Sequence, residues 1–136
     1  MNVNTAIQKL KEKGYKHTKQ REQILNILVN KDHYIAAKEI IERIKQHFPN
    51  VSYDTIYRNL YLLTNEELLE MTDLHGEKHF RIMCHSKGHH HHLICNTCGK
   101  TKTIDFCPMD IVDDKLEGYQ IDTHKFEIYG LCPQCL

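Results

Sequence analysis

The chain has 136 residues, 26% of them charged, and its 18 Lys and Arg residues balance 18 Asp and Glu residues. This length accommodates one domain or two small ones with modest cores. No apolar run approaches the ~20 residues that cross a bilayer, and no signal-peptide hydrophobic stretch follows Met1, so we expect a soluble cytoplasmic protein with no membrane partner. In that compartment, six cysteines in so short a chain favour metal binding over disulfides.

The zero net charge hides a division along the chain. Residues 1–60 carry 11 Lys/Arg against 6 Asp/Glu, a balance of +5, and residues 61–136 carry 7 against 12, a balance of −5. All six cysteines and eight of the eleven histidines lie in the second part. This division favours polyanion contact by the first part and cation binding by the second, with charge scatter on an ordinary surface as the alternative.

Four helical patterns of apolar residues occupy the first part. The first covers residues 4–13 and is followed by Gly14 as a C-terminal stop. Thr18 and Ser52 are positioned to cap the second and fourth helices, and the third helix spans about residues 36–47. The apolar positions expected to form the core are Ala6, Ile7, Leu10, Ile24, Leu25, Ile27, Leu28, Ile40, Ile41, Ile44, Ile56, Leu60 and Leu63.

The fourth helix has features of a DNA recognition helix. Helical geometry puts Asp54 and Arg58 opposite its apolar face, with Thr55 and Tyr57 on the flanks. An exposed Tyr57 could pack on thymine methyl groups, and Arg58 could bond a guanine edge bidentately. An ordinary solvated helix face is the alternative on this helix alone.

A hairpin follows the helices. Two strand patterns, residues 68–74 and 77–83, flank a His75-Gly76 turn. Helices followed by a hairpin give the order of a winged helix-turn-helix, in which the wing commonly rests on the DNA backbone. The sequence therefore predicts an α+β protein with a winged-helix DNA-binding domain over residues 1–83 and a metal-binding domain over residues 84–136.

Two Cys-x-x-Cys hooks form the strongest motif in the chain. Cys95 and Cys98 make one hook, Cys132 and Cys135 make the other, and 33 residues separate the two hooks. Each hook offers two thiolates from one tight turn, so two hooks complete a closed tetrahedral zinc site. Such a site would contribute folding energy to a small domain. Redox chemistry competes for either hook alone, but the two hooks together favour structural zinc.

Four consecutive histidines precede the first hook. A purification tag would lie at a chain end, whereas this run lies in mid-chain. Because side chains alternate along a strand, His90 and His92 would share one face, and His89 and His91 the other. The run could therefore serve two metal sites, with Cys84 joining the His90/His92 face. Sulfur and imidazole ligands prefer zinc over magnesium, calcium or manganese, and a solvated histidine cluster with adventitious metal affinity is the alternative.

These motifs together resemble the ferric uptake regulator (Fur) family of metal-sensing repressors, and within it the zinc uptake regulators, over nearly the whole chain. The family's Gly-x-x-x-Thr-x-x-Arg segment occurs at residues 14–21, and its Ser-x-x-Thr-hydrophobic-Tyr-Arg recognition helix occurs at residues 52–58. Its His-x-His-hydrophobic-hydrophobic-Cys-x-x-Cys-Gly element occurs at residues 90–99, and the closing hook at residues 132–135.

The resemblance implies a homodimer with an N-terminal winged helix and a C-terminal α/β dimerisation domain that holds the structural zinc. Regulatory metal at the hinge between the domains would close the dimer on a palindromic operator in double-stranded DNA. The implied regulatory ligands are Cys84, His90 and His92, with Glu70, Asp73 or Asp105 as a fourth. A third site would use His89, His91 and His124, completed by Cys107 or Asp110. The implied DNA-binding residues are Lys16, Thr18, Arg21, Ser52, Thr55, Tyr57 and Arg58.

Two departures from the family pattern favour zinc over iron. The iron and peroxide branches often take a histidine from the region where this chain has Tyr34, with His33 one position earlier, and peroxide sensors place an aspartate where it has Cys84. The sequence therefore predicts a zinc-responsive repressor with structural and regulatory Zn²⁺, and no enzyme activity or small-molecule substrate. An iron, manganese or peroxide-sensing regulator of the same family is the alternative. A zinc hydrolase or a zinc-storage protein is more remote, since no nucleophile elbow or acid pair is present and storage needs no winged helix.

Overall fold

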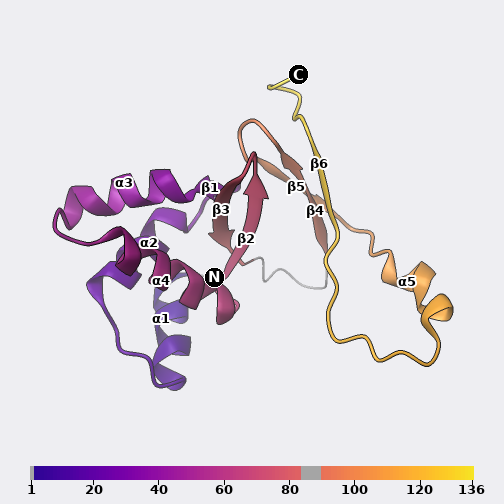
Figure 1. The fold of residues 1–136 in the computed structure, drawn as a ribbon, viewed down its shortest axis with the longest axis horizontal. Helices are drawn as coiled ribbons and strands as arrows, with labels where there is room; N and C mark the ends of the chain where they lie inside the picture. The colour runs from indigo at the N-terminus through magenta and orange to yellow at the C-terminus, as the bar shows by residue number, and fades with distance from the viewer. Residues whose placement is uncertain (1, 84–89) are drawn as a thin grey trace. The chain divides into compact units, whose positions relative to one another are not determined.

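The computed structural model describes residues 2–83 and 90–136, and the chain divides into two compact units, Met1–His85 and Ser86–Leu136 (Figure 1). The first unit contains four long helices and a small sheet, and the second contains another sheet and the cysteine-rich motifs. Within the described ranges, no helix is both long enough and apolar enough to cross a membrane.

Both predicted N-terminal caps are confirmed in the first unit. Its helices are α1 (Val3–Glu12), α2 (Lys19–Leu28), α3 (Ala37–His47) and α4 (Tyr53–Asn65). The hydroxyl of Thr18 accepts the backbone N–H of Arg21 at 3.2 Å, and the hydroxyl of Ser52 accepts the backbone N–H of Thr55 at 3.1 Å. These bonds satisfy amide groups that the first turn of a helix leaves without partners, and they therefore set where α2 and α4 begin.

Gly14 ends α1, as its position in the sequence predicts. Its φ of +90° lies in the left-handed region, which a side chain would disfavour. The N–H groups of Gly14 and Tyr15 donate to the carbonyls of Lys11 and Leu10 at 3.0 and 2.9 Å, the two bonds of a Schellman motif. The chain thus leaves α1 sharply and enters residues 13–18, which we call the α1–α2 loop.

The apolar faces of the four helices meet in one core. Every predicted core position is buried except Ile7, which packs against the core while remaining partly exposed. Phe80 from the sheet is also fully buried. Because each buried Leu, Ile or Phe side chain stabilises a fold by roughly 1.5–3 kcal/mol, this core is the main source of stability in the first unit.

The sheet of the first unit is the predicted hairpin with one added strand. Strands β2 (Leu69–Leu74) and β3 (Glu77–Ile82) pair antiparallel around His75 and Gly76, whose φ values of +54° and +79° fit a type I′ turn. A short strand, β1 (Ile35–Ala36), pairs antiparallel with β3, so the strand order is β1-β3-β2. Strand β1 was not predicted, because two residues are too few to show a period-two pattern.

The second unit is a small α/β arrangement. Its elements are β4 (His91–Cys95), β5 (Thr101–Ile104), α5 (Met109–Val112), a 3₁₀ helix (Asp113–Leu116) and β6 (Glu127–Gly130). The central strand β4 pairs antiparallel with β5 and parallel with β6. A winged helix followed by this unit confirms the predicted α+β class.

The second unit buries few side chains. Those buried among its described residues are Ile94, Cys95, Cys132, His91 and His92. Four of these five carry atoms that bind metals. The apolar core of the second unit is therefore much smaller than that of the first.

Candidate metal centres and DNA-binding surface

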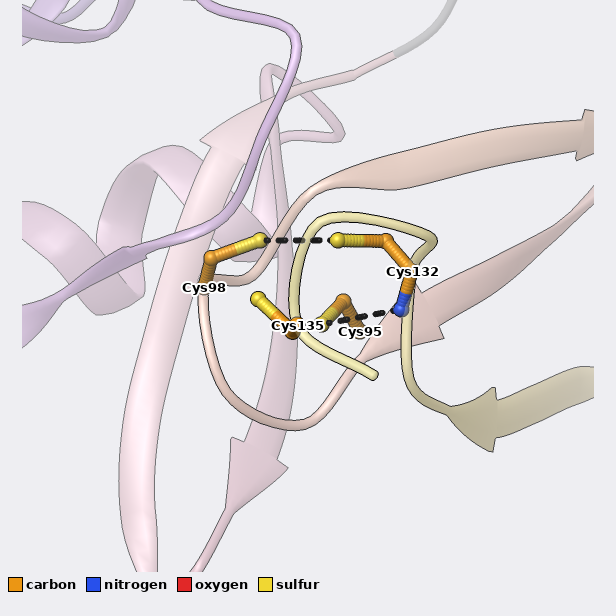
Figure 2. Close-up of side chains that lie close together, drawn as sticks. All are labelled: Cys95, Cys98, Cys132 and Cys135. Atoms are coloured by element: carbon orange, nitrogen blue, oxygen red, sulfur yellow. Dashed lines mark hydrogen bonds between the residues drawn. The ribbon is translucent and has the colours of Figure 1, made fainter.

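Two turns bring four cysteines together in the second unit (Figure 2). Cys95 and Cys98 belong to the turn at the end of β4, and Cys132 and Cys135 to the turn that follows β6. The four sulfur atoms all lie within 4.8 Å of one another, and the Sγ atoms of Cys98 and Cys132 are 3.7 Å apart. The two hooks therefore form one group, as their sequence pattern predicts.

The backbone of the two strands holds the hooks next to each other. The parallel pairing of β4 and β6 sets Cys95 opposite Gly130. In the first hook, the N–H of Gly99 donates to the carbonyl of Cys95 at 2.9 Å, with Gly99 at a φ of +76°. In the second hook, the N–H of Cys135 donates to the carbonyl of Cys132 at 2.9 Å. Each tight turn thus presents two thiols to the same point.

The electrostatics of the four thiols favour a bound cation. Backbone hydrogen bonds from Cys98 and Cys132 lower the pKa of Cys95 to about 6, and the N–H of Cys132 lies 3.4 Å from its sulfur. A hydrogen bond with the Cys132 thiol, together with burial, raises the pKa of Cys135 to about 12. Thiolates this close repel one another, so they ionise together only when a cation balances their charge. Four converging sulfur atoms fit Zn²⁺ in a structural site.

His90 and His92 lie on the same side of the chain where β4 begins. Their ring centroids are 5.2 Å apart, and His92 is buried. This pairing follows the alternation of side chains along a strand, on which the sequence-based prediction depended. Cys84, predicted for the regulatory site, and His89, predicted for the third site, lie outside the described residues.

His91 lies in a different group, with Cys107 and His124. The ligand atoms of these three residues lie within 4.8 Å of one another, and the Sγ of Cys107 is 3.4 Å from the Nε2 of His124. The ring of Phe126 packs edge-on against His91, with centroids 5.4 Å apart. One thiol and two imidazoles are ligands that suit zinc. We call these three residues the His-Cys-His group.

The structure brings Cys107, rather than Asp110, to the two histidines. The sequence left both residues open for this position. Asp110 lies in α5 with an exposed side chain and does not belong to the group found among the described residues. The meeting of Cys107 with His124 depends on the path of residues 119–126, which form no helix or strand. No periodic pattern in the sequence could have predicted it.

The acidic residues expected as a fourth regulatory ligand have other surroundings. Glu70 in β2 is opposite Arg81 in β3, with its Oε2 atom 3.7 Å from Nε of the arginine. Asp73 forms an ion pair with Lys78 across the same hairpin at 2.7 Å. Asp105 follows β5 and is exposed. A metal at Glu70 or Asp73 would therefore compete with a cationic side chain.

On α4, Arg58 is exposed but Tyr57 is less exposed than predicted. The Arg58 side chain is 80% exposed and forms an ion pair with Asp54, one turn earlier, at 2.9 Å. The ring of Tyr57 is half-buried, packs against the core and stacks on Tyr61 with centroids 6.1 Å apart. The reason is that Tyr61 lies four residues later on the same flank of the helix.

The remaining predicted DNA-binding residues are three hydroxyl side chains and two cationic side chains. Thr18 and Ser52 use their hydroxyls as helix caps, and the hydroxyl of Thr55 lies 2.9 Å from that of Ser52. Arg21 is half-buried and donates hydrogen bonds within the first unit. Lys16, on the α1–α2 loop, is exposed. Among the predicted residues, Lys16 and Arg58 thus present exposed cationic side chains.

The chain is similar to known proteins over nearly its whole length. Residues 12–129 match the family model described as the ferric uptake regulator family. The chain is 47% identical over 135 residues to the ferric uptake regulation protein of Staphylococcus epidermidis (strain ATCC 12228 / FDA PCI 1200), covering 99% of this chain and 96% of that protein.

Two solved structures have a similar fold. One is a zinc uptake regulator complexed with zinc and DNA, with a TM-score of 0.74 and 20% identity over 98% of this chain and 91% of that one. The other is the Helicobacter pylori ferric uptake regulator Fur, with a TM-score of 0.72 and 22% identity over 99% of this chain and 94% of that one. At these identities the likeness concerns the fold alone. The family match and the 47% identity show more: this chain belongs to the ferric uptake regulator family and is a transcriptional regulator.

Proposed function

We propose that this protein is a zinc-responsive transcriptional repressor that binds a palindromic operator in double-stranded DNA as a homodimer. One observation carries the choice of zinc. Both groups of potential metal ligands found among the described residues contain sulfur, namely the four cysteines of the hooks and the His-Cys-His group. Sulfur and imidazole ligands suit zinc, whereas carboxylate-rich sites suit manganese and many iron sites.

Each cluster has its own role in this proposal. The four hook cysteines hold a structural zinc that stabilises the second unit. His90 and His92, with Cys84 and one of Glu70, Asp73 or Asp105, bind the regulatory zinc. His91, Cys107 and His124, with His89, bind a third zinc. The 5.2 Å separation of the His90 and His92 rings and the grouping of Cys107 with two histidines support this division.

The DNA-binding role falls to the first unit. Helix α4 enters the major groove, where Arg58 bonds a guanine edge and Tyr57 contacts a thymine methyl group, while Lys16 contacts the DNA backbone. In a symmetric dimer, two such helices match two half-sites about one helical turn apart. Exposed apolar side chains on the second unit support dimerisation through that unit, namely Ile111, Tyr119, Ile128, Tyr129 and Leu131.

Iron is the second candidate effector, because the curated relative described above is named a ferric uptake regulation protein. One feature of this chain favours zinc instead. Tyr34 occupies the position where the iron and peroxide branches often supply a histidine, and it is buried beneath Arg81, whose guanidinium lies 5.7 Å from the ring centroid. A buried phenol is a poor substitute for an imidazole ligand.

A metal titration separates the two candidates. A palindromic duplex would first be selected from a random-sequence pool by the zinc-loaded protein. Its affinity would then be measured by fluorescence anisotropy at buffered free concentrations of zinc, of iron(II) under anaerobic conditions and of manganese. We expect half-maximal binding at a far lower free concentration for zinc than for the other metals. Equal or tighter binding with iron(II) would reverse the choice of effector.

A further inference from the structure

Arg21 lies in the first turn of α2 and belongs to the family's Gly-x-x-x-Thr-x-x-Arg segment, which places it among the residues expected to contact DNA. Its side chain is half-buried, in contrast to the exposed side chain of Arg58. Helices α2 and α4 pack against each other in the first unit (Figure 1). The surroundings of Arg21 therefore determine whether it faces DNA or the protein.

The guanidinium of Arg21 bridges two segments that are far apart in the sequence. Its Nε donates to Oδ1 of Asn59 in α4 at 2.8 Å, and its Nη1 donates to the backbone carbonyl of Lys16 at 2.7 Å. The guanidinium also lies 5.9 Å from the centre of the Tyr15 ring. Asn59 is only 8% exposed, on the inner side of the helix that carries Arg58 outward. One side chain thus joins α2, α4 and the α1–α2 loop.

A second contact fixes the other end of the same loop on the same helix. Glu66, which caps the C-terminal end of α4, accepts hydrogen bonds from the Lys13 ammonium at 2.6 Å and from the Tyr15 hydroxyl at 2.8 Å. The loop is therefore tied to α4 at two points, because the side chains of Lys13 and Tyr15 bind Glu66 and Arg21 links the Lys16 carbonyl to Asn59. A planar guanidinium suits the Asn59 end, because its N–H groups point in fixed directions that a lysine ammonium does not reproduce.

We propose that Arg21 is a positioning residue that holds the α1–α2 loop, and with it Lys16, in register with the recognition helix, rather than a residue that contacts DNA. The effect of Arg21 on DNA binding rests on the proposed repressor function. Its effect on the order of the α1–α2 loop concerns the protein without DNA. Each effect can therefore be tested, and can fail, separately.

Hydrogen exchange tests the structural part. In the zinc-loaded, DNA-free protein, Arg21→Lys keeps the charge but cannot reach both acceptors, and Asn59→Leu removes the acceptor in α4. We expect both variants to accelerate amide exchange in residues 13–18 at least several-fold, while amides in the middle of α4 remain protected. Arg43→Lys is the matched control, since Arg43 forms a surface ion pair with Glu39 on α3, away from the α1–α2 loop. Unchanged exchange in residues 13–18 in both folded variants would overturn the inference.

Operator affinity tests the functional part, with the duplex selected by the zinc-loaded wild-type protein. We expect Asn59→Leu to weaken binding by roughly fivefold or more, although Asn59 is buried, and Arg21→Lys to do the same although no charge is lost. The decisive comparison is the double variant with Lys16→Ala. If Arg21 acts through the loop, Arg21→Lys has little further effect once Lys16 is removed.

A direct contact gives a different pattern. Additive losses for Arg21→Lys and Lys16→Ala, with Asn59→Leu binding as wild type, would show that Arg21 touches DNA and would overturn the proposal. A wild-type protein that selects no duplex would instead reject the proposed repressor function, and the exchange experiment would still decide the structural role of Arg21.

Discussion

Arg58 and Asp54 form an ion pair one helical turn apart on α4, with side chains 80% and 70% exposed. Exposed pairs at this spacing contribute only about 0.3–0.5 kcal/mol, so a guanine edge can replace the carboxylate as the partner of Arg58. Asp54 also places a negative charge on the surface that we expect to face DNA. We therefore expect the pair to lower affinity for phosphates in general more than affinity for a site with a well-placed guanine.

Substitutions of Arg58 and Lys16 should affect DNA binding in different ways. Arg58→Ala should cost roughly 1–3 kcal/mol at the operator and relax the preference for one base pair, because a bidentate guanine contact is lost. Lys16→Ala should weaken binding to all sequences and reduce the slope of log affinity against log salt by about 1. Anisotropy titrations at several salt concentrations, on the operator and on single-base variants, measure both effects. Equal loss of base preference in the two variants would contradict this division.

Cys107 and Asp110 provide a matched pair for the third metal site. Cys107→Ser replaces a thiolate with a hydroxyl that stays protonated at neutral pH and binds zinc poorly, so we expect the loss of one zinc per protomer at low free zinc. Asp110→Asn should keep the wild-type zinc content, because Asp110 is outside the His-Cys-His group. Elemental analysis after dialysis against buffered zinc measures both. A normal zinc content in Cys107→Ser with a loss in Asp110→Asn would exchange the roles of the two residues.

At the scale of elements, the contact between the α1–α2 loop and the end of α4 should depend on pH. The Lys13 ammonium and then the Tyr15 hydroxyl, through their hydrogen bonds, lower the pKa of Glu66 below its usual 4.5. Because the folded-state pKa is the lower one, the contact stabilises the fold fully above about pH 4.5 and loses this effect as the pH falls through the folded-state value.

Glu66→Gln should therefore destabilise the first unit at pH 6 and destabilise it less at pH 3, because the contribution of the charged carboxylate declines as the pH falls. Urea unfolding followed by far-UV circular dichroism at the two pH values measures the difference. Glu42→Gln, which removes an exposed carboxylate on α3, is the control and should shift neither curve appreciably. A Glu66→Gln variant that is equally destabilised at both pH values would show that the charge of Glu66 is not what matters.

The elements that could be predicted from the sequence are those specified by residues close together in the chain. The Thr18 and Ser52 caps and the Gly14 stop are short-range patterns, and all three occur in the structure. Strand β1 was missed because its two residues depend on pairing with β3 rather than on a local pattern. The path of the chain between β5 and β6, which brings Cys107 to His124, is likewise determined by contacts between residues far apart in sequence.

At the scale of the whole molecule, the two units should respond differently to the loss of zinc. The first unit has a large apolar core, whereas most buried side chains in the second carry metal-binding atoms. Cys98→Ser should therefore unfold the second unit and convert the dimer into monomers, while most of the helical circular dichroism, which comes from the first unit, remains. Sizing chromatography and circular dichroism measure the two effects. A stable dimer with unchanged melting would contradict a structural zinc at the hooks.

A substitution of Cys84, which belongs to neither hook, should separate the regulatory zinc site from the structural zinc site. A thiolate at this position would join the imidazoles of His90 and His92, whose rings lie 5.2 Å apart, in the proposed regulatory site. Cys84→Ser exchanges the thiolate for a protonated hydroxyl. The variant should fold, dimerise and keep the structural zinc, because the four hook cysteines are unchanged. It should nevertheless lose zinc-stimulated operator binding at low free zinc.

A titration of operator affinity against buffered free zinc tests this separation, with Cys107→Ser as the comparison from the third site. We expect the Cys84→Ser curve to shift to higher free zinc by at least tenfold, since one tenfold step corresponds to about 1.4 kcal/mol and a lost zinc–thiolate bond exceeds that. The Cys107→Ser curve should differ from wild type mainly at higher zinc, where a weaker site fills. A Cys84→Ser curve that overlies the wild-type curve would reject Cys84 as the sensor. It would also remove the ligand that most separates this chain from the iron and peroxide branches, and iron(II) would become the favoured effector.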